Sequence, residues 1–215
     1  MKTYDGIIFD LDGTLWDPTV ACAHAWNAVL KKRGYQFDEI TPQDIKSICG
    51  TPIEAGIVRL LPKIQRKEIR VLAELLAQRE REFLSVEKGR IYDGVFEGLK
   101  TLAQKFPLFI VSNCQEGYLE DFIAYAGIKD FIRDFESHGR TGLTKSQNIL
   151  LLMKRVNLKS AVYIGDTDGD KEAAEKAGID FIHASYGFSP MTKAKVKVES
   201  FTELCALLKI NPFFR

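Results

Sequence analysis

A predicted strand that ends in acidic residues is the first chemical feature of this chain. Residues 7–9 are bulky and apolar, and Asp10 and Asp12 follow them at once. Consecutive bulky apolar residues are typical of a strand that is buried on both faces of a parallel sheet. Ligands bind at the carboxyl ends of such strands, whereas aspartate is also an ordinary turn residue. The segment alone therefore leaves a ligand site and a simple turn as alternatives.

Two further predicted strands also end in polar residues. These are Ser112 and Asn113 after the apolar run 108–111, and Asp166, Asp168 and Asp170 after the apolar run 161–164. Parallel strands would bring all three ends to one edge of the sheet. Carboxylates crowded there would repel one another unless a cation lies among them, and oxygen ligands favour Mg²⁺. The sequence therefore predicts a magnesium site, and we assign Asp168 instead to a helix cap.

The order of elements from residue 92 onward determines the predicted fold. Strands at 108–111, 161–164 and 180–183 alternate with helices, which is typical of parallel strands joined by right-handed crossovers. The predicted helices span about 95–105, 116–126, 146–156 and 171–177, and a last helix begins after Ser200. Together with the first strand, this pattern predicts an α/β fold with a doubly wound parallel sheet, or Rossmann-like core.

The segment from 18 to 88 shows no strand pattern and separates the first strand from the later ones. Helices are predicted at about 18–33, 42–49, 52–61 and 63–87, with start signals at Asp17-Pro18, Thr41-Pro42 and Thr51-Pro52. We interpret residues 18–88 as an inserted α-helical domain, and residues 1–17 and 89–215 as the core. The two connections, Gly13 to Pro18 and the chain near Gly89, are expected to act as hinges.

Composition restricts the class of protein. The 215 residues are 46% hydrophobic and 27% charged with a net charge of +1, which is typical of a soluble globular protein and does not favour a nucleic-acid partner. Four cysteines without CxxC spacing indicate neither a zinc site nor a disulfide framework. The acidic N-terminal segment argues against a signal peptide, and no apolar run is long enough to cross a membrane. We expect a cytoplasmic protein of undetermined oligomeric state.

The polar segments, taken in order, resemble the four motifs of the haloacid dehalogenase-like hydrolase superfamily. The matching residues are Asp10-Leu11-Asp12-Gly13-Thr14, Ser112-Asn113, Lys145, and Gly165-Asp166-Thr167-Asp168-Gly169-Asp170. The first and fourth motifs together are specific, whereas the second and third alone are weak. The helical insertion resembles the cap domain of C1-capped members, notably those similar to phosphoglycolate phosphatase and beta-phosphoglucomutase.

The resemblance implies catalytic and substrate-binding roles for five residues. Asp10 would be the nucleophile that forms an aspartyl-phosphate, and Asp12 would be the general acid and then the general base. Ser112, Asn113 and Lys145 would bind the transferring phosphoryl group, with Ser112 and Lys145 also counted as catalytic. A buried serine that bonds its own backbone is the structural alternative for Ser112.

The resemblance also implies the metal ligands. Mg²⁺ would be bound by Asp10, by the backbone carbonyl of Asp12 and by the carboxylate of Asp166. Asp170 would order metal-bound water or complete the ligand set. Bound there, the ion would screen the anionic nucleophile from the anionic phosphate.

Lys145 is the position at which the chain departs from the superfamily pattern. Relatives usually have proline after this lysine, whereas this chain has Ser146. The difference affects local rigidity more than charge, and it leaves Lys129 and Lys154 as alternatives. We retain Lys145 because Thr144 is placed to begin the following helix at the edge of the sheet.

The leading hypothesis is a Mg²⁺-dependent phosphatase for a small phosphomonoester. A sugar-phosphate phosphomutase on the same core is the nearest alternative, since it differs mainly in the acceptor. A haloacid dehalogenase proper is disfavoured because it has no use for an acid at Asp12. A receiver-like signalling module would not need the helical insertion, and a non-catalytic phosphate-binding protein would not need the full set of carboxylates.

Overall fold

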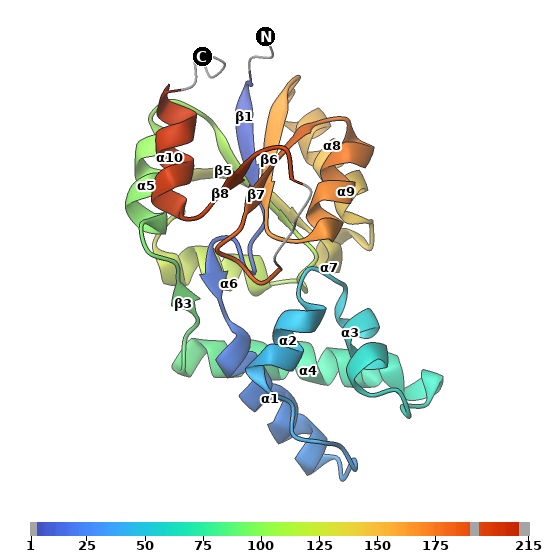
Figure 1. The fold of residues 1–215 in the computed structure, drawn as a ribbon. Helices are drawn as coiled ribbons and strands as arrows, with labels where there is room; N and C mark the ends of the chain where they lie inside the picture. Colours follow the sequence, from blue (N-terminus) through green and yellow to red (C-terminus); the bar gives the residue numbers. More distant parts are fainter. Residues whose placement is uncertain (1–3, 190–193, 211–215) are drawn as a thin grey trace.

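A six-stranded parallel sheet forms the centre of the molecule (Figure 1). The computed structural model describes residues 4–189 and 194–210. The strands lie in the order β5 (Ile132–Ser137), β4 (Leu108–Ser112), β1 (Gly6–Phe9), β6 (Ala161–Gly165), β7 (Asp180–Ala184) and β8 (Lys197–Val198). Every neighbouring pair is parallel. The doubly wound parallel sheet is therefore confirmed, and the sequence did not predict the two edge strands β5 and β8.

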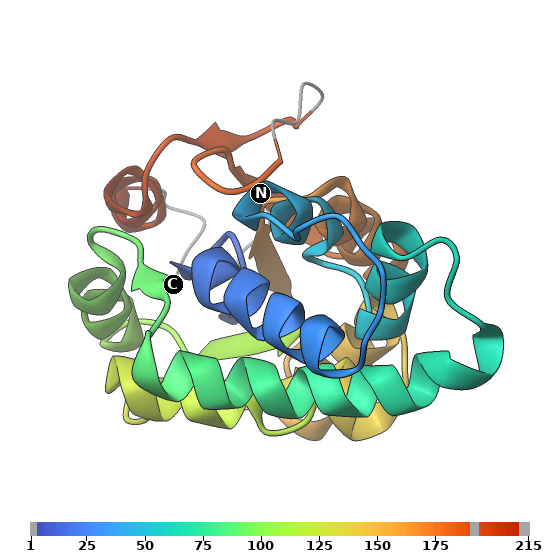
Figure 2. The same cartoon turned by 90° about the horizontal axis from the view of Figure 1, so that it is seen from below.

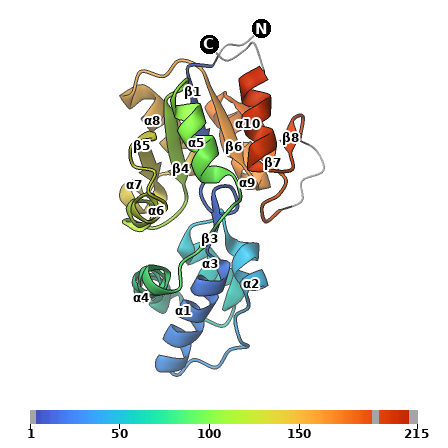
Figure 3. The same cartoon turned by 90° about the vertical axis from the view of Figure 1, so that its left-hand side faces the viewer.

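Helices cover both faces of this sheet (Figures 1 and 3). Helices α5 (Val95–Ala103) and α10 (Phe201–Ile210) cover one face, and α8 (Lys145–Arg155) and α9 (Asp168–Ala177) cover the other. Alternate residues of β1 point to the two layers: the ring of Phe9 stacks on Phe201 with centroids 5.9 Å apart, and Ile8 belongs to the core that contains Ile149. Burying each such side chain contributes roughly 1.5–3 kcal/mol, so both faces hold the central strand in place.

Two helices near the carboxyl edge complete the core. Helix α6 (Tyr118–Ala126) ends at Gly127, whose left-handed φ of +65° suits glycine. Helix α7 (His138–Thr141) is a single turn after β5 that the sequence did not predict. Within residues 4–189 and 194–210, no helix combines the length and the apolar character that a membrane crossing requires.

Four helices form a separate group beyond the carboxyl ends of the strands (Figures 1 and 3). They are α1 (Thr19–Lys32), α2 (Pro42–Ile48), α3 (Ile53–Leu60) and α4 (Arg66–Val86). Seen from below, α1 lies along α4 (Figure 2), with Trp26 and Leu76 buried in the shared core. The predicted helical insertion is confirmed, and its position places it over the edge where the polar strand ends meet.

The helix starts in this group agree only in part with the sequence signals. Thr41 caps α2 through a reciprocal capping box with Asp44, as predicted. Thr51 does not cap α3, because its hydroxyl donates to the Ile48 carbonyl and Pro52 occupies the cap position. Helix α1 begins at Thr19, whose backbone N–H donates to the Asp17 carboxylate.

The two connections between sheet and helical group lie side by side. Strands β2 (Trp16–Asp17) and β3 (Arg90–Ile91), which the sequence did not predict, pair as a short antiparallel ribbon. Gly89 immediately precedes β3, and a Cβ at this position would lie 2.5 Å from the Trp16 ring. The close approach of backbone to ring therefore requires glycine at this position.

Candidate active site

The register of the sheet brings the polar strand ends together. Phe9 at the end of β1 is level with Ile110 of β4 and Ile164 of β6. Asp10 and Asp166, each of which follows the last residue of its strand, therefore lie at the same edge as Ser112. All three of these polar residues are buried. Because β1 is central, its terminal carboxylate is flanked on both sides by polar groups.

Lys145 joins two of the predicted carboxylates. Its Nζ lies 2.8 Å from Oδ1 of Asp10 and 2.6 Å from Oδ1 of Asp170, and all three side chains are buried. Burial alone would lower the pKa of Lys145, but these two carboxylates raise it well above its usual value. The lysine is therefore a fixed cation beside Asp10.

The start of helix α8 positions this lysine. Thr144 is the N-cap residue, and it forms a capping box with Gln147. The hydroxyl of Ser146 lies 3.2 Å from that of Thr144. The capping box fixes the helix start without the proline usual in relatives. Lys129 and Lys154 are exposed, and among the described residues it is Lys145, not either of these, that forms an ion pair with Asp10.

A set of oxygen ligands surrounds Asp10. One carboxylate oxygen each from Asp10, Asp166 and Asp170 lies within 4.8 Å of the others. Burial raises the pKa of Asp10 and of Asp166, and the repulsion from Asp170 adds to the effect in both. Among the described residues, Oδ2 of Asp10 is buried without any hydrogen-bond partner. A hard cation would satisfy that atom and offset the repulsion, so the donors fit Mg²⁺.

Neighbouring backbone fixes the other two carboxylates. The Asp166 carboxylate accepts from the backbone N–H of Phe188 at 2.7 Å, and a Cβ at Gly13, where φ is +85°, would lie 2.3 Å from Asp166. Asp170 also accepts from the hydroxyl and the N–H of Thr167, the N-cap of α9.

The predicted cap role of Asp168 is wrong. Asp168 is an exposed residue in the first turn of α9, and Thr167 caps the helix instead.

The carboxylate of Asp12 accepts hydrogen bonds from two aromatic side chains. Its Oδ1 accepts from Trp16 Nε1 at 2.8 Å and from the Tyr118 hydroxyl at 3.2 Å. Burial raises the pKa of Asp12 to about 6, although both donors lower it. Trp16 also packs against Phe122 with centroids 4.8 Å apart, so packing fixes the ring that donates to Asp12. A carboxyl group with a pKa near neutrality is suited to proton transfer.

The loop after β4 links the sheet edge to the helical group. Asn113 donates from Nδ2 to the Gly50 carbonyl at 2.7 Å. Gln115 donates from Nε2 to Oε2 of Glu80 in α4 at 2.8 Å. The amide predicted to bind phosphate thus also contacts the helical group.

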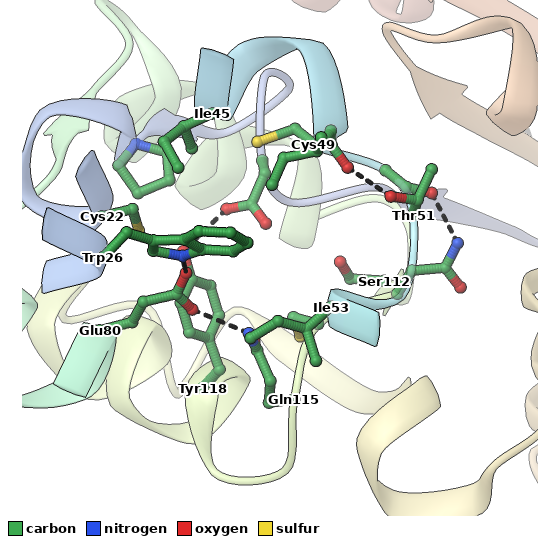
Figure 4. A pocket seen from close by; sticks show the side chains of 16 residues that line it. Cys22, Trp26, Ile45, Cys49, Thr51, Ile53, Glu80, Ser112, Gln115 and Tyr118 are labelled. Atoms are coloured by element: carbon green, nitrogen blue, oxygen red, sulfur yellow. Dashed lines mark hydrogen bonds between the residues drawn. The ribbon is translucent and has the colours of Figure 1, made fainter. Parts of the chain in front are cut away.

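A small pocket of about 60 Å³ lies between the sheet edge and the helical group (Figure 4). Ser112, Asn113 and Asp12 lie at the core side of the lining, and the helical group contributes the apolar residues Trp26, Ile45, Ile48 and Ile53. The lining also contains Glu80, Gln115 and Tyr118, none of which belongs to the four sequence motifs. One feature of the sequence indicates that Glu80 is buried: it occupies a position of the apolar stripe of α4 between Leu76 and Leu84.

Other residues that might perform chemistry have structural roles. His183 is buried, and its Nε2 lies 3.2 Å from the Asp166 carbonyl oxygen, so it supports the backbone of that residue. His24 pairs with Glu87 at the surface. Burial raises the pKa of the Cys114 thiol well above its usual value, so it stays neutral and weakly nucleophilic.

Comparison with protein families agrees with this geometry. Residues 7–184 match the model of the haloacid dehalogenase-like hydrolases. This chain belongs to that family. Its matched region runs from the first strand to the last residue of β7 and includes each predicted site residue.

Individual relatives cover nearly the whole chain. A phosphoglycolate phosphatase of Chromobacterium violaceum is 29% identical, with 97% of this chain and 98% of the relative covered. A probable phosphatase, IndB, of Dickeya dadantii is 25% identical, with 95% of each covered. Among solved structures, a haloacid dehalogenase-like family protein of Streptococcus pneumoniae superposes with a TM-score of 0.82 at 20% identity, covering 94% of this chain and 97% of its own. The structural likeness supports the fold.

Proposed function

We propose that this hydrolase is a Mg²⁺-dependent phosphatase that cleaves a small phosphomonoester through an aspartyl-phosphate. The observation that carries the proposal is the state of Asp10: one oxygen is held by Lys145 at 2.8 Å, and the other is buried without a partner among the described residues. Family membership and relatives that are named phosphatases support the same reaction class. The chain is thus a phosphoric monoester hydrolase, and the proposal adds its metal, nucleophile and intermediate.

The proposed chemistry divides between the first two aspartates. A carboxylate oxygen of Asp10 bonds to phosphorus while the ester P–O bond breaks, and Asp12 gives its proton to the leaving oxygen. Asp12 then accepts a proton from water, which attacks phosphorus and releases inorganic phosphate and the free Asp10 carboxylate. Its pKa of about 6 suits both directions of transfer.

The remaining site residues would bind the phosphoryl group and the metal. Lys145, Ser112 and Asn113 would donate to the phosphoryl oxygens. Asp10, Asp166 and Asp170, with the backbone carbonyl of Asp12, would hold Mg²⁺, as the spacing of the three carboxylates permits. The bound ion would neutralise the charge that phosphate brings to this acidic edge.

The helical group is proposed as a cap that covers the site during turnover. Residues 18–88 would form the cap, and residues 1–17 and 89–215 the core. The β2–β3 ribbon carries both connections, which suits a hinge. The contacts of Asn113 with Gly50 and of Gln115 with Glu80 join cap to core in this structure.

The proposal is tested by phosphate release from a panel of small phosphomonoesters. The purified chain should hydrolyse at least one ester with Mg²⁺ and lose that activity in EDTA. Asp10→Asn should lower turnover by at least about 10⁴-fold, as expected when a nucleophile is removed, and mass spectrometry after rapid acid quench should find a phosphoryl group on the peptide that contains Asp10 only in the unmodified enzyme. Asp168→Asn is the matched control, since it removes an exposed charge from the same edge. Unchanged turnover in Asp10→Asn would disprove the nucleophile assignment.

A further inference from the structure

The far end of the active-site pocket contains a buried carboxylate that the proposed phosphoryl transfer does not use. Glu80 of α4 lines the pocket and is only 6% exposed. In Figure 4 it contacts Trp26 and Gln115 on one side of the pocket, and Ser112 lies on the other side. A substrate whose phosphate lies at Ser112 would therefore direct its leaving group toward Glu80.

Glu80 accepts hydrogen bonds from two neutral side chains. Oε1 accepts from Trp26 Nε1 at 2.6 Å, and Oε2 accepts from Gln115 Nε2 at 2.8 Å. Of the described residues that line the pocket, none is a lysine, arginine or histidine. The two donors stabilise the carboxylate, and a carboxylate oxygen can accept more than one hydrogen bond.

The other polar groups at this end do not favour an anion. Trp26 has a single N–H, which is already donated to Glu80. The Tyr118 hydroxyl donates to Asp12. Burial raises the pKa of the Cys22 and Cys49 thiols well above the usual value, so both are neutral at physiological pH. This end of the pocket therefore offers a carboxylate acceptor to a ligand, and its described lining contains no cationic side chain that would pair with an anion.

We infer that Glu80 is a specificity residue that selects phosphomonoesters whose leaving group presents a hydroxyl or ammonium donor, and that it discriminates against leaving groups with a carboxylate. The inference rests on the proposed phosphatase function. It predicts that this chain prefers a different substrate from the one in the names of several relatives, the phosphoglycolate phosphatases. The reason is that 2-phosphoglycolate would place its carboxylate opposite Glu80. Two carboxylates that face each other in a buried pocket repel strongly.

Three esters of nearly equal size test the inference. Ethylene glycol monophosphate, O-phosphoethanolamine and 2-phosphoglycolate have two-carbon leaving groups that end in hydroxyl, ammonium and carboxylate. Burial raises the pKa of Glu80 to about 7, with the charge of Asp12 adding to the effect, so kcat/KM is measured at pH 8 with Mg²⁺, where Glu80 is ionised. We expect kcat/KM for the hydroxyl and ammonium esters to be at least about tenfold higher than kcat/KM for 2-phosphoglycolate, because the carboxylate of the latter would be repelled by Glu80.

The matched variant is Glu80→Gln, which removes the charge and keeps an oxygen to accept from Trp26. It should raise kcat/KM for 2-phosphoglycolate about tenfold, lower that for O-phosphoethanolamine, and change the hydroxyl ester least. Glu74→Gln removes an exposed charge from the same helix and should change none of the three. A preference of the unmodified enzyme for 2-phosphoglycolate, or an equal change for all three esters in Glu80→Gln, would overturn the inference.

p-Nitrophenyl phosphate separates failure of this inference from failure of the proposed function. Hydrolysis of this aryl ester with none of the three small esters hydrolysed would overturn the leaving-group assignment and leave the phosphatase proposal intact. Hydrolysis of none of the four would overturn the phosphatase proposal, and the assignment with it.

Discussion

Two buried carboxylates of the candidate site, Asp10 at the sheet edge (the core end) and Glu80 in the helical group (the cap end), are stabilised in different ways. Asp10 at the sheet edge lies 2.8 Å from the ammonium group of Lys145. Glu80 in the helical group accepts from the neutral donors Trp26 and Gln115, and no ion pair to it is present within residues 4–189 and 194–210. The pKa of each is raised by burial, but the lysine offsets part of that rise at Asp10. Burial thus disfavours the charge of both groups, but at Asp10 a buried cation offsets part of that cost, whereas at Glu80 neutral hydrogen-bond donors do so.

This difference matches what each end would bind. A phosphoryl group is anionic, so the core end requires cations: Lys145 in the fold, and a metal ion at the carboxylates. The cap end would bind the leaving group, and an uncompensated carboxylate there favours donors and cations in the ligand. A ligand that donates to Glu80 would relieve the energetic cost of burying it.

The largest expected effect comes from removing the cation at the core end. Lys145→Met would leave Asp10 and Asp170 buried without their common partner. Breaking a buried ion pair in this way costs about 3–5 kcal/mol of unfolding free energy, and loss of a phosphoryl-binding cation should reduce turnover by about 10²–10³-fold. Urea unfolding and phosphate release measure the two effects.

Lys154→Met is the control for this variant, because it removes an exposed charge from the same helix. Lowering the pH from 8 to 5 should recover part of the lost stability, since protonation of Asp10, whose pKa is raised to about 7, removes its repulsion with Asp170. If Lys145→Met unfolded at the same urea concentration as the unmodified protein, Lys145 would not be the charge partner of Asp10.

Removing the charge of Glu80 at the cap end should raise the free energy of unfolding, whereas Lys145→Met at the core end should lower it. The pKa of Glu80 is about 7 in the folded protein and ordinarily 4.5. Between these values the folded state keeps a proton that the unfolded state releases, so stability falls as the pH rises through this range and the penalty is complete above pH 7. Glu80→Gln should therefore gain about 2–3 kcal/mol over the unmodified protein between pH 5 and pH 8.

Urea unfolding of both proteins at pH 5, 6, 7 and 8 measures this gain. Buried carboxylates that do not interact with Glu80 contribute equally to both proteins and cancel in the difference, whereas the interaction of Asp12 with Glu80 is part of the measured gain. Glu74→Gln should show no pH-dependent gain, because Glu74 is an exposed residue. A constant difference between Glu80→Gln and the unmodified protein across this pH range would show that Glu80 has no raised pKa.

The same contrast explains how much could be predicted from the sequence. Apolar runs identified β1, β4, β6 and β7 because strands buried on both faces leave a continuous hydrophobic signal. Strand β5 lacks that signal, since it carries Asp134 and Glu136. Their charges are paired with Arg155, nineteen or more positions away, at 2.8 Å and 2.7 Å. Compensation over such a distance in the chain cannot be read from a local pattern.

The candidate site was likewise predictable at one end only. Asp10, Asp166, Asp170 and Lys145 belong to motifs at strand ends and a helix start, so topology alone brings them together. The cap end is formed by side chains whose contacts depend on how α1 and α4 pack against the loop after β4. Glu80 was indicated only by its place in an apolar stripe, and nothing local connected it to Gln115.

The smallest expected effect concerns Asn113, which lies at the core side of the pocket lining and contacts the helical group. Its hydrogen bond to the Gly50 carbonyl holds the cap loop against the sheet edge. Loss of one such bond is worth about 1 kcal/mol, so Asn113→Ala should raise KM about fivefold if the residue acts mainly through the cap. A role in holding the phosphoryl group during transfer would instead lower kcat by about 10²-fold. Steady-state kinetics with the best ester distinguish the two, alongside Gln104→Ala as a control, because Gln104 is an exposed amide outside the pocket lining. A change in KM alone assigns Asn113 to cap closure, and a change in kcat assigns it to the phosphoryl group.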